Sequence, residues 1–333
     1  MTAKNHFLRL LATTASIAVL AAGFLVVLLA TQPANAAFQG TNGRIVFQRD
    51  PDGFRGPKDP EIYSINFKGD NLRQLTDNAT GDTQPAFSAD GTKIVYSGGD
   101  GRAWDSYKAD IFVMKANGFD KTRLTKERQM PGASTADDLQ PAFSPSGRQI
   151  VFVRNGPLAD GHTLSNDDIY TIRTDGTNPK RLVDIPSFEY HSGGQPAWSP
   201  NGTKIAFFSG VEEEYSIETI RPDGTGRKAL TTGYAPNWSP DGSRMAFHRS
   251  AAGSGSRIYV ADADGTDEIP LPTEEGAYDS EPAFSPGGGK VVFASDRDGD
   301  YDLYITTADG SDDPQQLTNY PGDERSPNWQ PVQ

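Results

Sequence analysis

The 333-residue sequence contains no cysteine, which excludes a disulfide framework, a thiolate metal site and lipid attachment to an N-terminal cysteine. It has only four histidines, and it lacks a Gly-x-Ser-x-Gly elbow, a His-Glu-x-x-His motif and a Gly-rich phosphate loop before a helix. The common signatures of serine hydrolases, zinc proteases and nucleotide-binding enzymes are therefore missing. The sequence assigns no catalytic residue.

Positive charge is also scarce: 31 Lys and Arg residues stand against 44 Asp and Glu residues, which gives a net charge of −13. A surface this acidic repels phosphate groups and anionic lipid, so we expect neither nucleic acid nor a membrane surface as the partner. Beyond the N-terminal segment, no stretch keeps the 3.6-residue apolar period of an amphipathic helix. Instead, 35 Gly and 24 Pro are spread along the chain, as a fold with many turns requires.

The long apolar run of the chain lies at its N-terminus. A positively charged start precedes an uncharged, apolar segment over residues 10–30, and Ala34-Asn35-Ala36 forms a small-x-small cleavage pattern. We predict that residues 1–36 are an export signal and that residues 37–333 form the folded domain, which is then secreted, periplasmic or associated with the cell envelope. The segment is long enough to span a bilayer, so an uncleaved anchor is the alternative.

One phrase recurs along the rest of the chain, and its clearest copy is Gln195-Pro196-Ala197-Trp198 followed by a Ser-Pro-Asn-Gly turn. The aromatic residues at the same position of the six copies are Phe87, Phe143, Trp198, Trp238, Phe284 and Trp329. They lie 40 to 56 residues apart. Repetition at this period is typical of radially repeated β architectures, in which one small sheet cannot bury its faces alone.

Each repeat contains four short strand candidates. The recurring phrase is the first, and a Gly-containing turn leads to a β-branched and aromatic run such as Ile150-Val151-Phe152-Val153. A third run such as Asp302-Leu303-Tyr304-Ile305 leads through an Asp-Gly or Asn-Gly hairpin to a short fourth one. The domain begins with a second strand over 44–47 and ends with a first strand over 327–329. We therefore predict an all-β, six-bladed β-propeller of four-stranded antiparallel blades, closed by pairing of the N- and C-terminal strands.

These motifs resemble a known repeat. Phe-Ser-Pro-x-Gly, the acidic phrase over 294–304, and Asp-Gly followed by Leu-Thr are similar to the TolB-type, WD40-like (PD40) propeller repeat. The resemblance covers about residues 40–333 and implies the propeller fold, while it is less specific for function. TolB carries an α/β domain before its propeller, through which it communicates with other Tol proteins. Here the predicted first strand follows the predicted signal closely, so we expect a TolB-like propeller without that domain.

In such blades, the first-to-second and third-to-fourth connections share one face of the disc, and the remaining connections share the other. The long insertions all belong to the second set. We expect this long-loop face to bind the partner, because function concentrates in loops that a rigid scaffold presents. The predicted contact residues are Phe54, Trp104, Tyr107, Met130, His162, Phe188, Tyr190 and His191. Each of these side chains has the alternative of packing back onto its own loop.

Two further sets of residues are candidates for ligand binding. The residues just before each innermost strand should ring the mouth of the central channel, where their amides would hold water or a ligand; they are Gln84, Gln140, Gln195 and Glu281, with Ala235 and Ser326. An acidic hairpin has the density of oxygen ligands that calcium favours, although its Gly is too early for an EF-hand. Its candidate ligands are Asp296, Asp298, Asp300 and Asp302. We expect no other cofactor.

The leading hypothesis is an exported, non-enzymatic and monomeric propeller that binds a protein, a peptide or an envelope polymer through its long-loop face. The alternative is a propeller enzyme, a hydrolase or lyase acting on a carbohydrate or lactone at the channel mouth. That enzyme would use carboxylates, His162 or His191, and a divalent metal, and fold alone does not decide between the two. His248 follows an apolar strand, so we expect it to be structural.

Overall fold

The computed structural model describes residues 41–53, 59–99, 109–125, 136–157, 165–185, 191–211, 214–251 and 255–332. The chain divides into two compact units, Met1–Gln32 and Pro33–Gln333, and every described residue lies in the second. The predicted export signal lies outside the described residues and stays a prediction. Within the described ranges, no helix is long and apolar enough to cross a membrane.

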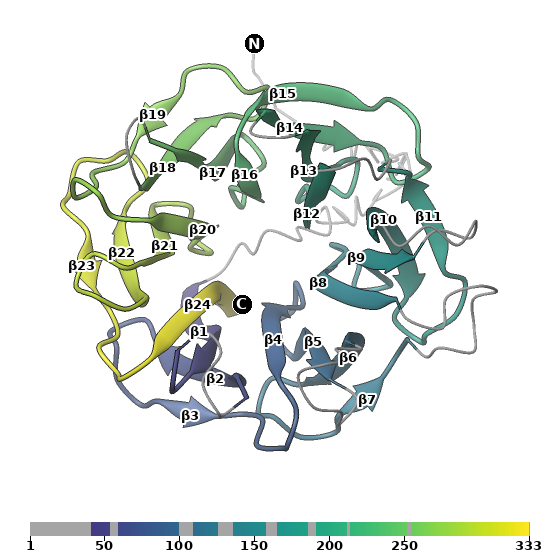
Figure 1. The fold of residues 1–333 in the computed structure, drawn as a ribbon, viewed down its shortest axis with the longest axis horizontal. Coiled ribbons are helices and arrows are strands. Elements are labelled where there is room, and N and C mark those ends of the chain that lie inside the picture. The colour runs from purple at the N-terminus through teal and green to yellow at the C-terminus, as the bar shows by residue number, and fades with distance from the viewer. Residues whose placement is uncertain are drawn as a thin grey trace, which may run out of the picture. The chain divides into compact units, whose positions relative to one another are not determined.

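Within the same ranges, 24 strands form six four-stranded antiparallel sheets, which stand as blades around a central channel (Figure 1). From the channel outward, the clasp blade contains β24 (Asp323–Val332), β1 (Thr41–Asp50), β2 (Glu61–Asn66) and β3 (Arg73–Gln74). Blade 2 contains β4 (Asp82–Phe87), β5 (Lys93–Gly99), β6 (Ala109–Lys115) and β7 (Thr122–Arg123). Blade 3 contains β8 (Asp137–Phe143), β9 (Gln149–Pro157), β10 (Ser165–Arg173) and β11 (Lys180–Val183).

The remaining blades repeat this order. Blade 4 contains β12 (His191–Trp198), β13 (Ile205–Val211), β14 (Glu214–Ile220) and β15 (Lys228–Thr232). Blade 5 contains β16 (Tyr234–Trp238), β17 (Arg244–Ser250), β18 (Ser256–Asp262) and β19 (Ile269–Pro270). Blade 6 contains β20 (Asp279–Phe284), β21 (Lys290–Ser295), β22 (Asp302–Thr307) and β23 (Gln315–Gln316). The predicted all-β fold with six four-stranded blades is confirmed.

The two ends of the folded chain meet in the clasp blade. Strand β24 pairs antiparallel with β1, so that Ile45 lies opposite Trp329 and Thr41 lies opposite Val332. Trp329 is 1% exposed and packs with Ile45 and Phe47, both fully buried. The predicted closure of the ring by the terminal strands is therefore confirmed.

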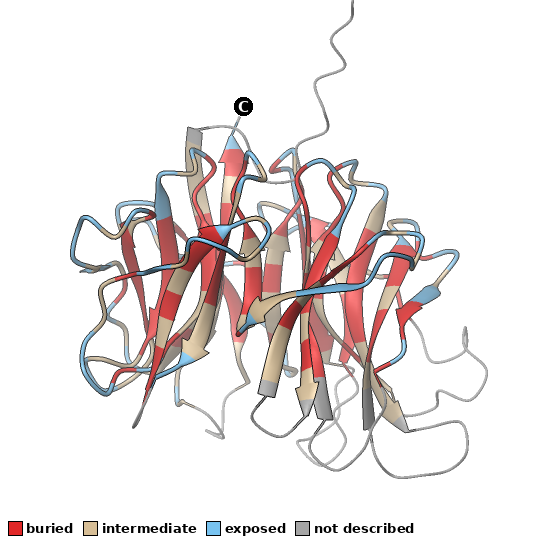
Figure 2. Ribbon diagram, turned by 90° about the horizontal axis from the view of Figure 1, so that it is seen from above, coloured by how far each residue is buried: buried red, intermediate tan, exposed pale blue. Residues whose placement is uncertain are grey.

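The apolar core consists of wedges between neighbouring blades. Each of the six clusters of buried apolar residues draws its members from two adjacent blades. On β1, Ile45 and Phe47 face blade 6, whereas Val46 between them faces blade 2. Successive side chains of a strand point to opposite faces of the sheet. A strand that is covered on both faces therefore needs an unbroken run of apolar residues. Buried residues accordingly fill the middle of the strands, and the exposed ones lie mainly in the turns (Figure 2).

Candidate functional site

Most of the predicted contact residues cannot be placed. Phe54, Trp104, Tyr107, Met130, His162, Phe188 and Tyr190 lie outside the described residues, and His191 is placed only as the first residue of β12. Their role stays a prediction. The structure does place the strand ends that flank these segments. Every internal segment outside the description follows either a second or a fourth strand, so in antiparallel blades its flanking strand ends lie on one face of the disc, the long-loop face.

The residues predicted to ring the channel line one common cavity of about 140 Å³. Its walls include Gln84, Gln140, Gln195, Ala235, Glu281 and Ser326, together with the Pro residues that follow them. This volume accommodates several waters or one extended side chain, because each water needs only about 10–15 Å³ of cavity volume measured in this way. Among the described residues that line it, Glu281 is the only one with an ionisable side chain, and none is a histidine.

All six of these residues have a left-handed backbone. Their φ angles are 54° for Gln84 and Gln140, 46° for Gln195, 50° for Ala235, 53° for Glu281 and 52° for Ser326. Each lies at an irregularity where the innermost strand shifts register against its partner, for example between Thr83 and Ala86. Non-glycine residues rarely adopt this conformation, which costs on the order of 1–2 kcal/mol for each residue. Such strain concentrates at functional sites, which makes the channel mouth the candidate site.

A relay of hydrogen bonds runs from blade to blade around the channel. The backbone N–H of Gln140 donates to Gln84 Oε1 at 3.0 Å, and that of Gln195 donates to Gln140 Oε1 at 2.7 Å. On the far side, the N–H of Ser326 donates to Glu281 Oε2 at 2.8 Å. Each of these side chains therefore satisfies the strained N–H of another blade. The amide oxygens of Gln84 and Gln140, which we expected to hold water or a ligand, thus accept hydrogen bonds from the protein itself.

Gln48 completes this relay and was missed from the sequence. Its Oε1 accepts the N–H of Gln84 at 3.0 Å. Gln48 thus does for the clasp blade what Gln84 and Gln140 do for theirs, because the side chain of Ser326, the channel residue of the clasp blade, is too short to reach the next blade. Gln48 comes from the second strand of the clasp blade, outside the recurring phrase, so repeat comparison gave no signal for it. The relay skips blade 5, because Ala235 has no polar side chain. Gln195 Nε2 of blade 4 lies 3.5 Å from Glu281 Oε1 of blade 6 instead.

The strain at the channel predicts a stabilising substitution. Ala235→Gly should raise the free energy of unfolding by about 1 kcal/mol, because glycine adopts a φ of 50° without steric cost and Ala235 contributes no side-chain hydrogen bond to the relay. Gln140→Gly is the matched control, since it relieves the same strain but removes the acceptor of the Gln195 N–H. Urea unfolding measures both. A destabilised Ala235→Gly variant would contradict the assignment of strain to this position.

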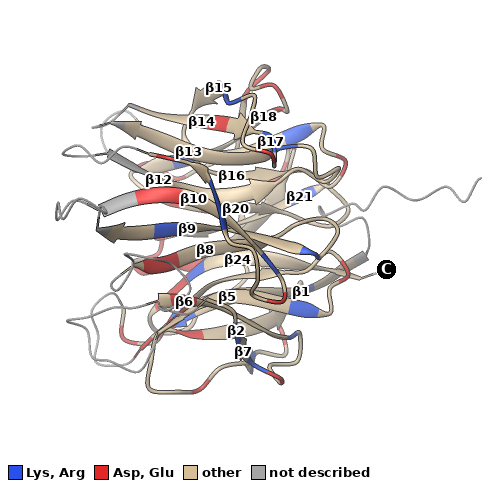
Figure 3. Cartoon of the chain, turned by 90° about the vertical axis from the view of Figure 1, so that its right-hand side faces the viewer, with Lys and Arg blue, Asp and Glu red and all other residues tan. Residues whose placement is uncertain are grey.

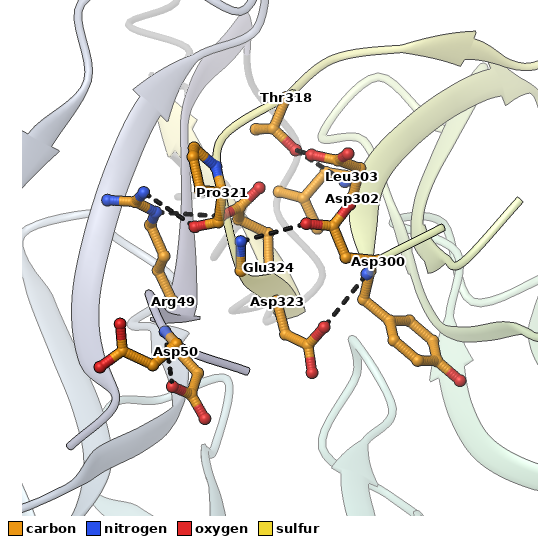
Figure 4. A network of polar contacts seen from close by, with 12 residues as sticks. Arg49, Asp50, Asp300, Asp302, Leu303, Thr318, Pro321, Asp323 and Glu324 are labelled. Atoms are coloured by element: carbon orange, nitrogen blue, oxygen red, sulfur yellow. Dashed lines mark hydrogen bonds and ion pairs between the residues drawn. The ribbon is translucent and has the colours of Figure 1, made fainter. Parts of the chain in front are cut away.

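A rim of buried carboxylates lies near the long-loop face, where the first and third strands begin. Its members are Glu61, Asp82, Asp110, Asp138, Asp168, Asp279, Asp302 and Glu324. Figure 3 shows acidic segments of β8 and β10 toward one end of their strands. Threonines just after the fourth strands brace part of the rim: Thr125 Oγ1 donates to Asp110 at 3.0 Å, and Thr318 Oγ1 donates to Asp302 at 2.9 Å (Figure 4). In both blades an acidic residue at the start of the third strand, Asp110 or Asp302, occurs together with a later Leu-Thr pair, Leu124-Thr125 or Leu317-Thr318, and this bracing explains the pairing.

Some carboxylates of the rim have an arginine partner, whereas others are held by neutral hydrogen-bond donors. Arg154 makes two bonds of 2.6 Å to Asp138, and Arg297 lies 2.9 Å from Asp279. Glu61 and Asp82 instead share Asn78, whose N–H donates to Glu61 and whose Nδ2 donates to Asp82. Burial therefore raises the pKa of Glu61 to about 7 and the pKa of Asp82 to about 6. Burial, together with the neighbouring Asp302, raises the pKa of Glu324 to about 9.

The acidic hairpin brings three of its four candidate aspartates together, and His248 packs against an aromatic ring. Carboxylate oxygens of Asp298, Asp300 and Asp302 lie within 4.8 Å of one another, whereas Asp296 accepts the backbone N–H of Tyr278 at 2.7 Å and lies outside this group. His248 stacks on Tyr234 with ring centroids 5.2 Å apart, and burial lowers its pKa to about 4. His248 does not line the channel cavity, which agrees with the structural role expected for it.

Six four-stranded antiparallel blades closed around a channel by the two chain ends define the protein as a six-bladed β-propeller. Residues 102–279 and 196–333 match the PD40 family model, the TolB beta propeller domain, and the chain belongs to this family. The resemblance read from the motifs is thereby confirmed.

Two of the known proteins that are similar to the chain are named TolB, and others are named as peptidases, such as the Uncharacterized peptidase YuxL of Bacillus subtilis, 30% identical over 41% of this chain and 18% of that protein. The chain is 30% identical over 166 residues to the Protein TolB homolog of Chlorobium luteolum, covering 50% of this chain and 31% of that protein. It is 36% identical over 108 residues to the Tol-Pal system protein TolB of Gluconobacter oxydans, covering 29% and 23%. The chain thus matches less than a third of the length of either TolB relative. The crystal structure of TolB from Acinetobacter baumannii superposes with a TM-score of 0.68 over 87% of this chain and 67% of that one, and its 21% identity makes this a likeness of fold.

Proposed function

We propose that this protein is an exported TolB-like β-propeller that binds a protein, a peptide or an envelope polymer through its long-loop face. The observation that carries the proposal is the gathering of strand ends: the ends that flank the predicted contact segments lie on one face of a rigid disc. Loops presented in this way by a scaffold are the usual place of recognition. The name of the Gluconobacter oxydans relative, a Tol-Pal system protein, supports a protein partner.

Charge and geometry narrow the class of partner. A net charge of −13 favours a neutral or basic partner over an acidic one, because like charges across an interface are destabilising. The channel supports binding better than catalysis, since its described lining brings a single carboxylate, Glu281, and no histidine to the cavity. Glu281 alone provides one general acid or base, and the described lining places no second titratable side chain beside it.

The test is quantitative capture of partners from the native host. Trp104→Ala with Tyr107→Ala should reduce the capture of specifically enriched partners by at least about 30-fold, as the loss of about 2 kcal/mol from interface aromatics implies. The matched control is Phe67→Ala with Phe119→Ala. These aromatics are 42% and 69% exposed on third-to-fourth hairpins, and so on the opposite face. Unchanged capture by the first pair and loss by the second would move the binding surface to that face.

A further inference from the structure

The lysines of the described chain all lie on one face of the disc. This face is opposite the long-loop face and carries the first-to-second and third-to-fourth turns, so we call it the short-turn face. The eight described lysines lie in these turns or at the strand ends next to them, and every one is exposed. Among the described residues, Lys115 is the only one of the eight in an ion pair, with Asp120 at 2.5 Å. The other seven positive charges thus have no carboxylate partner there.

Two neighbouring blades concentrate this charge. The turns β2–β3, β4–β5 and β6–β7, with the strand residues that flank them, carry five exposed basic residues, called here the basic patch: Lys68, Arg73, Lys93, Lys115 and Lys121. The same turns carry three aspartates, Asp70, Asp90 and Asp120. The corresponding turns of blades 3 and 4 add six basic residues without an ion pair in the described chain and two aspartates, whereas those of blades 5 and 6 carry two basic residues and seven aspartates. The clasp blade and blades 2 to 4 thus form a positive crescent on a chain whose net charge is −13.

The two faces of the disc act separately on their surroundings. A strand of seven residues such as β5 spans about 23 Å, and in physiological salt exposed charges are screened beyond about 8–10 Å. Carboxylates on the long-loop face therefore do not cancel the positive crescent. The net charge, from which we expected no membrane partner, is an average over two unlike faces.

Two exposed aromatic side chains lie among the residues of the basic patch. Phe67 precedes Lys68, whose Nζ lies 5.8 Å from the centroid of its ring, and Phe119 lies in the same hairpin as Lys121. The two aromatic residues are 42% and 69% exposed. Basic side chains beside exposed aromatic rings are typical of surfaces that lie at a lipid interface, because the rings enter the headgroup region while the cations attract anionic lipid.

The N-terminal segment is attached to the disc on the same face. Thr41, at the start of β1, lies opposite Val332 at the end of β24, and both strand ends belong to the short-turn face. The apolar residues 10–30, which we predicted to be an export signal or an anchor, therefore join the disc from this side. An acidic protein in solution gains nothing from this attachment, whereas a membrane that holds the segment does. The position of the attachment favours lipid as the occupant of the face.

We propose that the positive crescent on the short-turn face binds a membrane surface with anionic headgroups, and that Phe67 and Phe119 enter the interface. Each basic residue close to such a surface adds to the attraction, which falls off within a Debye length. Bound in this way, the disc turns its long-loop face away from the membrane, toward the proposed partner. Membrane binding by one face and partner binding by the other are independent, so either can fail without the other.

Sedimentation of the full chain with lipid vesicles tests the crescent. Vesicles of phosphatidylcholine with about 30% phosphatidylglycerol should bind the chain at least about tenfold more tightly than vesicles of phosphatidylcholine alone. This preference should vanish at about 1 M salt, where the Debye length is about 3 Å. Lys68→Gln with Lys93→Gln and Lys121→Gln should remove most of it. The N-terminal segment is the same in every variant, so differences between variants report on the disc.

The matched control is Lys58→Gln with Lys108→Gln and Lys126→Gln, which changes the net charge equally in segments flanked by strand ends of the long-loop face. It should keep the preference for phosphatidylglycerol.

Phe67→Ala with Phe119→Ala should weaken binding to both kinds of vesicle by at least about threefold and keep the preference, because these rings contribute apolar contact and no charge. The proposal is overturned if the wild type shows no preference for phosphatidylglycerol, or if the control loses as much of it as the patch variant does. Binding to polyglutamate in solution without such a preference would also overturn it, and would make an acidic polymer the partner of this face.

Discussion

Replacing Trp329 with alanine should lower the free energy of unfolding by about 3–5 kcal/mol, the usual cost of removing a buried aromatic side chain. Trp329 is 1% exposed and packs against Ile45, its partner across the β1–β24 pair, and against residues of blade 6. The substitution opens a void at the point where the ring closes. Urea unfolding followed by tryptophan fluorescence or circular dichroism measures the loss, with Val332→Ala as a control, since Val332 on the same strand is 40% exposed.

A second variant, Trp238→Ala, distinguishes the closure of the ring from the ordinary packing of a buried side chain. Trp238 occupies the equivalent position in blade 5 and is 5% exposed, but its strand is held by chain on both sides. Trp238→Ala should cost a similar free energy of unfolding, whereas only Trp329→Ala should expose the C-terminal strand to carboxypeptidase. Equal resistance of the two variants to digestion would show that the clasp does not depend on this side chain.

Stability should fall as the pH rises from about 4 to about 7, because two buried carboxyls at the seam of the clasp blade and blade 2 hold protons in the folded state. Burial raises the pKa of Glu61 to about 7 and that of Asp82 to about 6. In the unfolded chain both groups ionise near pH 4. The folded protein therefore binds more protons across this interval, so the contribution is complete below about pH 4 and is lost as the pH passes about 7. For Glu61 the change is on the order of 3 kcal/mol.

Glu61→Gln isolates this effect. The amide oxygen still accepts the N–H of Asn78, which bonds to Glu61 Oε1 at 2.8 Å, but the side chain no longer ionises. Between about pH 5 and pH 8 the variant should lose less stability in urea unfolding than the wild type, by on the order of 3 kcal/mol. Glu275→Gln, at an exposed position between β19 and β20, should follow the wild type. Parallel pH profiles for the wild type and Glu61→Gln would contradict the prediction.

The architecture could be predicted from the sequence because the same local sequence signals recur along the chain. The Pro-x-aromatic phrase, the Asp-Gly hairpins and the split of the clasp blade between the two ends each depend on neighbouring residues, and the structure contains all three. The six residues that precede the phrase in its six copies line one cavity, which is a position that the repeat itself specifies. Their left-handed backbone was not foreseen, because Gln and Glu rarely adopt it and proline follows each of them.

The parts of the site that depend on contacts between blades could not be predicted. Gln48 completes the relay, and Glu324 faces Asp302, but each meets partners that are distant in sequence and that no repeat pattern connects. The buried rim was hidden for the same reason, since an Asp at the start of a strand looks solvated until the next blade covers it. The predicted loop aromatics, such as Trp104 and Tyr107, remain predictions.

The pairing of β1 with β24 also determines when the protein can finish folding. Arg44 donates its backbone N–H to Gln330, 286 positions further along the chain, so the first strand to be synthesised finds its partner only when almost the whole polypeptide exists. Contacts this distant in sequence form slowly. A growing chain therefore has no means of completing the disc until β24 has been made and can pair with β1.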